Sequence, residues 1–225
     1  MCKGTRVACS GMGVLSEFES KRLLEHHGVA ISRDALAHSA DEAIAAAAEI
    51  GGPVAVKLCG RSLAHKSERG LVRLGLDTPE AVRAAANDLL TAVVVDDGEV
   101  ALLVSEMVAG HRELIAGVAH TEQFGAALML GLGGVLTEAV GEAVFRLLPV
   151  SEADCQDMIE DLGMAALMAP LRGEPAVDQG ALADTLLSLA QAGGEGGIEA
   201  IDVNPLVIQE GLPVAVDALV VTTDP

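Results

Sequence analysis

The sequence has almost no aromatic side chains. Its 225 residues include three Phe, no Tyr and no Trp. Proteins that bind single-stranded nucleic acids stack bases on aromatic faces, so this chain lacks the side chains for that mode of binding. Positive charge is also scarce, since 14 Lys and Arg stand against 33 Asp and Glu, which leaves a net charge of −19. So acidic a chain repels phosphate backbones and anionic lipids, and the sequence therefore predicts no nucleic-acid partner and no membrane partner.

Cysteine and long apolar runs are scarce as well. The four cysteines show no Cys-x-x-Cys spacing, so we expect neither a disulfide framework nor a zinc site, but the reduced thiols of a cytoplasmic protein. The longest apolar run, residues 126–136, contains three glycines and is shorter than the ~20 residues that cross a bilayer. Residues 1–14 lack the continuous apolar stretch of a signal peptide, and we interpret them as a flexible leader.

What the sequence does contain is aliphatic. Hydrophobic residues make up 51% of the chain, so we expect a folded protein with a core of Ala, Val, Leu and Ile. Helix-like and strand-like patterns alternate, and the chain ends in hairpin-like strands, which predicts a mixed α+β fold rather than a purely parallel sheet. Helices are expected near residues 16–27, 41–50, 79–93, 151–163 and 180–192. Strands are expected near 54–58, 71–76, 100–107, 112–119, 126–130, 144–148, 198–203, 206–209 and 214–221.

Four basic side chains lie within ten residues of this acidic chain, namely Lys57, Arg61, His65 and Lys66. Lys57 ends an apolar run, where its ammonium must either reach solvent or meet an anion. This local concentration of positive charge favours a phosphate-binding site. His65 is either an ordinary surface histidine or a phosphoryl acceptor, because a neutral imidazole is nucleophilic at about pH 7.

Polar residues in the middle of the chain give two further candidates. Glu106 and Glu113 flank a turn, and carboxylates at the ends of buried strands need partners such as ribose hydroxyls, a metal or Arg. A salt-bridged pair at a hinge between lobes is the alternative. The glycine-rich segment 131–134 either presents backbone N–H groups to an anion or forms a packing turn.

Asn204 and Asp217 form a candidate metal site near the end of the chain. Asn204 closes one strand-like run, and Asp217 lies on a later one, so a hairpin-like arrangement can bring them together. Two oxygen ligands, completed by phosphate oxygens and waters, fit Mg²⁺. The alternative is an Asn–Pro turn and an unrelated aspartate on an edge strand.

A series of short motifs recurs in one order along the chain: Leu15–Lys21, Val54–Leu58, His65–Ser67, Ser105–Met107, Glu113–Gly117, Gln123–Gly125, Gly131–Gly134, Phe145–Arg146, Arg172–Gly173 and Asp202–Leu206. With these motifs the chain, from about residue 15 to 221, resembles the ATP-grasp domain, or β subunit, of the NDP-forming acyl-CoA synthetases, the ADP-forming acetate–CoA ligase type. More distantly it is similar to succinyl-CoA synthetase β. The resemblance implies a two-lobed ATP-grasp fold. We expect a leader (1–14), an N-terminal part with a phosphohistidine loop (15–111) and a C-terminal lobe with the metal site (112–225).

The resemblance also implies a phosphoryl-transfer site. Lys57 would hold the nucleotide phosphates, and His65 would take the phosphoryl group on a loop and deliver it to ADP. Asn204 and Asp217 would be the Mg²⁺ ligands. ATP or ADP and Mg²⁺ are therefore the expected cofactors.

The nucleotide base and ribose would lie further along the chain. The resemblance places the adenine hinge at Ser105, Glu106 and Met107, and turns Glu113 toward the ribose. Because the chain has no Tyr or Trp, we expect aliphatic and Met side chains to enclose the adenine, with Met107 the first candidate.

The family's reaction is acyl-CoA + ADP + phosphate = acid + CoA + ATP, through an acyl phosphate and a phosphohistidine. The sequence contains no glycine-rich fingerprint for CoA, so the resemblance implies a separate CoA-binding α-type partner in a hetero-oligomer. One alternative is a non-catalytic nucleotide-sensing or assembly subunit, motivated by Glu68-Arg69-Gly70-Leu71 where the family has Asp-Val-Gly-Gly, so that one glycine is lost. Another is an ATP-grasp carboxylate ligase that forms an acyl phosphate without His65.

Overall fold

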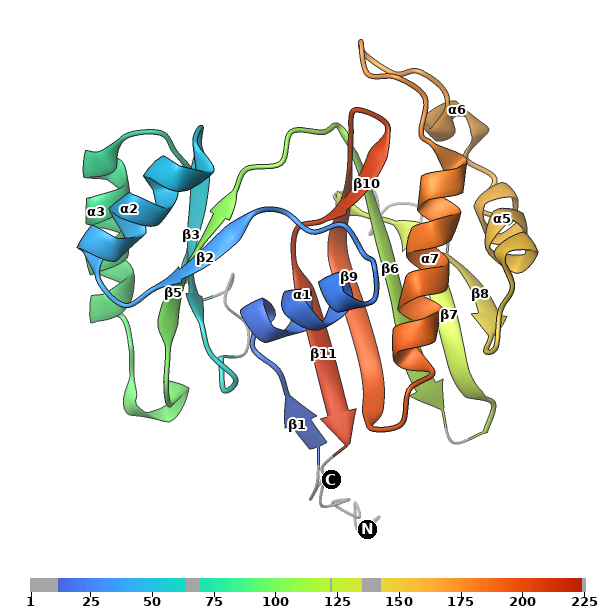
Figure 1. Cartoon of the computed structure of the whole chain (residues 1–225), viewed down its shortest axis with the longest axis horizontal. Coiled ribbons are helices and arrows are strands. Elements are labelled where there is room, and N and C mark those ends of the chain that lie inside the picture. Colours follow the sequence, from blue (N-terminus) through green and yellow to red (C-terminus); the bar gives the residue numbers. More distant parts are fainter. Residues whose placement is uncertain (1–11, 64–68, 122, 135–142, 224–225) are drawn as a thin grey trace, which may run out of the picture.

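Two lobes lie side by side, each built on one antiparallel sheet with helices against it (Figure 1). The computed structural model describes residues 12–63, 69–121, 123–134 and 143–223. Every pairing between its named strands is antiparallel, which confirms the predicted α+β class. Among the described helices, none is long and apolar enough to cross a membrane.

The small lobe contains the sheet β2-β5-β3-β4, with α2 and α3 on one face (Figure 1). Both helices begin at polar caps, because Ser39 Oγ accepts from the Glu42 N–H and Thr78 Oγ1 accepts from the Ala81 N–H. The elements are β2 (Asp34–Ala37), α2 (Ala40–Ile50), β3 (Val54–Cys59), β4 (Val72–Leu76), α3 (Pro79–Thr91), the 3-10 turn η1 (Val95–Asp97) and β5 (Ala101–Glu106).

The large lobe contains the sheet β1-β11-β9-β6-β7-β8, in which β10 also pairs with β9. Helices α1, α5 and α7 lie against one face of it (Figure 1). The elements are β1 (Met12–Val14), α1 (Glu17–His26), β6 (Arg112–Thr121), β7 (Gly125–Leu132), β8 (Ala143–Leu147), α5 (Glu152–Asp161), α6 (Ala165–Met168), α7 (Gln179–Gly193), β9 (Ile198–Gln209), β10 (Leu212–Ala215) and β11 (Ala218–Thr223).

Each lobe has its own core, and both are aliphatic, as the composition predicts. Val54, Val56 and Leu58 of β3 pack with the inner faces of α2 and α3 in the small lobe. The large lobe buries about twice as many described residues, mainly from β6, β7, β9, α5 and α7. The lobes therefore meet at a junction that belongs to neither core.

The structure corrects two expectations at the ends of the chain. The last residues of the predicted leader, 12–14, form β1, because they find an open edge on β11 and pair with its residues 221–223. The turn expected at Asn204–Pro205 is also wrong. Residues 198–209 form one strand, because β6 pairs with both halves of it and a register shift between Leu114 and Ala116 absorbs the irregularity.

The N-terminal helix α1 has a position that the predicted division did not foresee. Its residue Leu24 is fully buried in the core of the large lobe, although the segment 15–111 was expected to form one N-terminal part. The small lobe begins only at β2. Helix α1 thus lies against the large lobe (Figure 1), and its residues Glu17 and Lys21 form ion pairs with Lys57 and Asp34 of the small lobe.

Candidate functional site at the lobe junction

Lys57 lies on β3, where successive side chains point to opposite faces of the sheet. Since Val56 and Leu58 pack into the core of the small lobe, Lys57 points the other way, toward the large lobe. The residue is only 6% exposed. An ammonium that has lost its water needs anionic partners, which the large lobe supplies.

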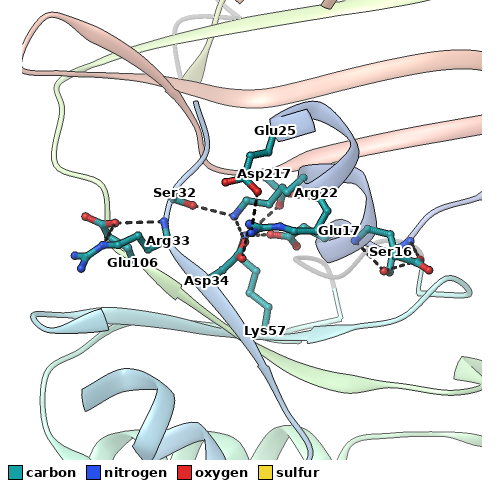
Figure 2. A network of polar contacts seen from close by, with 12 residues as sticks. Ser16, Glu17, Arg22, Glu25, Ser32, Arg33, Asp34, Lys57, Glu106 and Asp217 are labelled. Atoms are coloured by element: carbon teal, nitrogen blue, oxygen red, sulfur yellow. Dashed lines mark hydrogen bonds and ion pairs between the residues drawn. The ribbon is translucent and has the colours of Figure 1, made fainter. Parts of the chain in front are cut away.

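Two carboxylates meet Lys57. Its Nζ lies 2.6 Å from Glu17 Oε1 and 3.3 Å from Asp217 Oδ2 (Figure 2). Glu17 begins α1 and Asp217 lies between β10 and β11, so both come from the large lobe. Burial alone would lower the pKa of Lys57, but the charges and hydrogen bonds of Glu17 and Asp217 outweigh it and raise the pKa. Lys57 is therefore a cation that joins the two lobes.

A second set of ion pairs also links α1 to the small lobe. Asp34 of β2 contacts Lys21 Nζ at 2.7 Å and Arg22 Nη2 at 2.8 Å, and Lys21 also donates to Ser32 Oγ at 2.9 Å (Figure 2). The side chains of Lys21 and Asp34 have no exposed surface. Helix α1 thus offers an anion near its start and cations one turn later, and the small lobe offers the opposite charges.

The predicted adenine hinge lies where the chain passes from β5 to β6. Glu106 Oε2 accepts a hydrogen bond of 2.9 Å from Arg33 Nε, which lowers the pKa of Glu106. A salt bridge at the hinge therefore exists, and its cation is Arg33. Met107 is 38% exposed and its N–H donates to Pro53 O at 3.2 Å, whereas Ser105 is buried. The role of these residues at adenine stays a prediction.

The structure brings Asn204 and Asp217 together, as the hairpin argument expected. The Asn204 N–H donates to Asp217 O at 3.2 Å. Asp202 stands two residues before Asn204 on the same strand, and burial together with the charge of Asp217 raises the pKa of Asp202. Among the described residues, no three His, Cys, Asp or Glu side chains converge as a metal cage. A few oxygen ligands fit Mg²⁺, which seldom takes an all-protein cage and completes its shell with phosphate and water.

Glu113 belongs to a separate hollow on the large lobe. The Gly133 N–H donates to Glu113 O at 2.8 Å, and a Cβ at Gly134 would lie 2.8 Å from Glu113 Oε2. The hollow at Glu113 has a volume of about 230 Å³. It is smaller than a hollow of about 670 Å³ that is lined by Glu19 of α1 and by Arg61, which follows β3. Because the Gly133 N–H donates to Glu113, this amide of the glycine-rich segment packs against β6 and does not face an anion. The ribose role of Glu113 stays a prediction.

His65 and Lys66 lie outside the described residues, but both flanks of their segment are described. Arg61 Nε donates to Glu19 Oε2 of α1 at 3.0 Å. On the other side, Arg69 makes a two-pronged contact with Asp97, at 2.6 and 3.0 Å. The described residues on the two sides of this segment thus contact α1 and η1, respectively.

Several residues of the junction, among them Glu17 and Asp202, have no role assigned from the sequence. An acidic residue in the first turn of a helix is an ordinary feature, so Glu17 gives no signal of its own. Asp202 differs, because it stands in the Asp202–Leu206 motif next to a predicted metal ligand. Only the fold shows that Glu17 reaches Lys57 across 40 residues of chain.

Two antiparallel lobes that meet at a buried lysine, beside Asp217 and its hydrogen-bond partner Asn204, form the arrangement of an ATP-grasp domain. The family model of the ATP-grasp domain matches residues 6–222. The chain belongs to this family and, within it, to the β subunits of ADP-forming acetate–CoA ligases. It is 33% identical to subunit beta of acetate–CoA ligase (ADP-forming) II of Pyrococcus furiosus, over 96% of this chain and 94% of that protein.

Longer relatives contain the same domain. The chain is 35% identical to acetate–CoA ligase (ADP-forming) II of Archaeoglobus fulgidus over 92% of this chain, but spans only 30% of that protein. Among solved structures it is similar to acetyl-coenzyme A synthetase 1 of Ca. Korarchaeum cryptofilum. The complex with coenzyme A and Ca-AMPCP has a TM-score of 0.86 and 33% identity, with 93% of each chain covered. The complex with Mg-AMPPCP, whose phosphohistidine segment points towards the nucleotide binding site, has a TM-score of 0.78 and 32% identity, over 92% and 91% of the chains.

Proposed function

We propose that this chain is the nucleotide-binding subunit of an ADP-forming acyl-CoA synthetase. With a partner it would catalyse acyl-CoA + ADP + phosphate = acid + CoA + ATP. The single observation that carries the proposal is the Lys57 ammonium at the lobe junction, buried beside Asp217, whose backbone oxygen accepts from the Asn204 N–H. A cation and oxygen ligands at the meeting point of two lobes are what a metal–nucleotide complex requires.

Phosphoryl transfer at this junction needs positioning and charge neutralisation more than covalent chemistry. Lys57 would contact phosphate oxygens and balance their charge. A ring nitrogen of His65 would carry the phosphoryl group. In the forward direction its N–P bond breaks, a terminal phosphate oxygen of ADP forms the new O–P bond, and the leaving ring takes up one proton to become neutral imidazole.

Asn204 and Asp217 would hold Mg²⁺, which when bound neutralises phosphate charge and fixes the phosphate geometry. Ser105, Glu106 and Met107 would lie along the adenine, and Glu113 would face the ribose. The exposed Met107 side chain supports this assignment, because it offers an apolar surface at the hinge.

A CoA-binding α-type subunit would complete the enzyme as a hetero-oligomer in the cytoplasm. Two comparisons support a partner. The Pyrococcus furiosus relative of similar length is named subunit beta, and the Archaeoglobus fulgidus relative is about three times as long. Acyl-CoA cleavage would take place on that partner, and His65 would carry phosphate between the two.

The test is a phosphoenzyme assay on the full chain. Incubation with Mg–ATP should produce a phosphate that is acid-labile and base-stable, as expected for phosphohistidine. The His65→Ala variant should lose it, while the control variant His26→Ala, at an exposed helix end, should retain it. Persistence of the phosphate in His65→Ala would sink the assignment.

The same assay separates the two alternatives. Nucleotide binding without a phosphoenzyme, even with an α-type partner present, would favour a sensing or assembly subunit. The observation behind that candidate is the Glu68-Arg69-Gly70 sequence after His65, of which Arg69 is fastened to Asp97. Full turnover by His65→Ala would instead favour a ligase that forms the acyl phosphate directly.

A further inference from the structure

We propose that Glu17 is a positioning residue that holds the Lys57 ammonium so that Asp217 stays available to a divalent cation. The inference rests on the proposed function, because it concerns the same nucleotide site. It adds a residue of α1, outside the hinge and the metal ligands, to the machinery that prepares that site.

The contacts of Lys57 are unequal. Its Nζ lies 2.6 Å from Glu17 Oε1 but 3.3 Å from Asp217 Oδ2, so Glu17 is the main partner and Asp217 the lesser one. The exposure is unequal in the same sense, because the Glu17 side chain is 1% exposed and the Asp217 side chain 34%. Glu17 therefore contacts the ammonium from the buried side and Asp217 from the more exposed side, where a metal or phosphate would arrive; Figure 2 shows both contacts.

Two other described cations of this region, Lys21 and Arg61, already have partners of their own. Lys21 is bound to Asp34 and Ser32, and Arg61 faces Glu19. If Glu17 lost its charge, the Lys57 ammonium would keep one carboxylate only, and it would move toward Asp217. It would then compete with the divalent cation for the same oxygen atoms.

The charges give the direction of the effect. Glu17, Lys57 and Asp217 together carry −1 + 1 − 1 = −1 when all are ionised. Glu17→Gln makes the sum zero, which disfavours a dication and does not disfavour a phosphate anion. A loss of metal affinity without a loss of metal-free nucleotide affinity is therefore the signature of the proposed role. A merely structural role of the ion pair would weaken both.

The experiment measures ADP binding to the full chain by calorimetry, with Mg²⁺ and with EDTA, since the chain has no Trp or Tyr to report binding by fluorescence. Three variants are compared with the unchanged chain. Glu17→Gln removes the charge with little change of shape, and Glu17→Asp keeps the charge. The control, Glu19→Gln, makes the same chemical change two residues further on and breaks another ion pair between α1 and the small lobe.

Binding of ADP in EDTA should be unchanged or tighter in Glu17→Gln. The gain in affinity that Mg²⁺ produces should fall about tenfold, the size expected from one charge-assisted contact. Glu17→Asp should lie closer to the unchanged chain, and Glu19→Gln should keep the full gain. Direct titration with Mn²⁺ alone should show the same order.

Equal losses with Mg²⁺ and with EDTA, or equal losses in Glu17→Gln and Glu19→Gln, would overturn the proposal. Circular dichroism shows whether Glu17→Gln is folded. If it is unfolded, the Mn²⁺ titration of Glu17→Asp decides instead. If the unchanged chain binds no ADP under either condition, the proposed function itself fails, which is a different result.

Discussion

Individual residues at the junction show how a strongly acidic chain uses its few cations. Burying a charge is costly unless it is paired, and breaking such a pair costs more than the pair contributes. Lys21, Lys57 and Arg112 are all buried, and each contacts at least one carboxylate. Cations that are scarce in the sequence are thus placed where the two lobes and their loops must be held together.

Arg112 leads to a stability prediction. Its buried guanidinium donates to Glu174 and to the carbonyl oxygens of Leu167, Ala169 and Pro175. Arg112→Lys should lower the free energy of unfolding by about 2–4 kcal/mol, because one ammonium cannot satisfy this planar set of acceptors. Urea unfolding followed by circular dichroism measures the change.

The matched control is Arg83→Lys, in an exposed ion pair with Asp41. That substitution should change the free energy of unfolding by less than about 0.5 kcal/mol. A similar small change in Arg112→Lys would show that the carbonyl oxygens find other donors.

Among the elements, α1 best illustrates how local signals and tertiary contacts combine. Ser16 caps the helix, and its Oγ and Glu19 form a reciprocal capping box. Acidic residues at its start and Lys21 and Arg22 further along agree with the helix dipole. The same charge order faces Lys57, Arg61 and Asp34 of the small lobe, so it also orients α1 between the lobes.

Glu19 gives this helix a predictable pH dependence. The pKa of Glu19 is lowered from 4.5 to about 2, and the hydrogen bond from Arg61 is the largest cause of this shift. Because the folded-state pKa is the lower one, the stabilisation is complete above about pH 4.5 and is lost as the pH falls toward 2. The difference in Tm between the unchanged chain and Glu19→Gln should follow that course in a thermal-unfolding series.

Glu160→Gln serves as the control for this series, because Glu160 is exposed on α5. Its difference in Tm should stay small at every pH. A constant difference for Glu19→Gln between pH 7 and 2 would contradict the assigned cause.

On the scale of the whole molecule, the structure is two aliphatic cores joined by a polar junction. The core of the large lobe contains 28 buried described residues, against 14 in the small lobe. Hydrophobic burial is the main source of stability, so the small lobe has less of it to oppose opening. The ion pairs of Lys57 and Asp34 join this smaller lobe to the large one.

Hydrogen exchange should report this inequality. In native buffer, the amides of β3 and β5 should exchange faster than those of β6 and β9, as measured by mass spectrometry on peptides. Addition of Mg–ADP should slow exchange in β3 and β5 more than in β6 and β9, because the ligand would bind across the junction. Equal protection of the two sheets without ligand would contradict a less stable small lobe.

Much of the local structure could be predicted from the sequence. The caps at Ser39, Thr78 and Ser151, with Pro79 after Thr78, mark helix starts that the structure confirms. The short strand β2 and helix α6 gave no usable signal. Neither has a clear periodic pattern, and β2 exists because β5 offers it an edge. The continuous strand β9 was missed for a related reason, since pairing with β6 overrides the turn preference of Asn204–Pro205.

The candidate site divides in the same way. The amino-acid sequence by itself determined the class of fold, the aliphatic cores and the residue types of the candidate phosphate and metal site, because periodicity, composition and short motifs are local properties. The tertiary structure alone decided that Lys57 is held by Glu17, that Asn204 meets Asp217, and that α1 stands on the large lobe. Those facts depend on which buried charges face one another once the sheets have packed, and no local pattern contains that information.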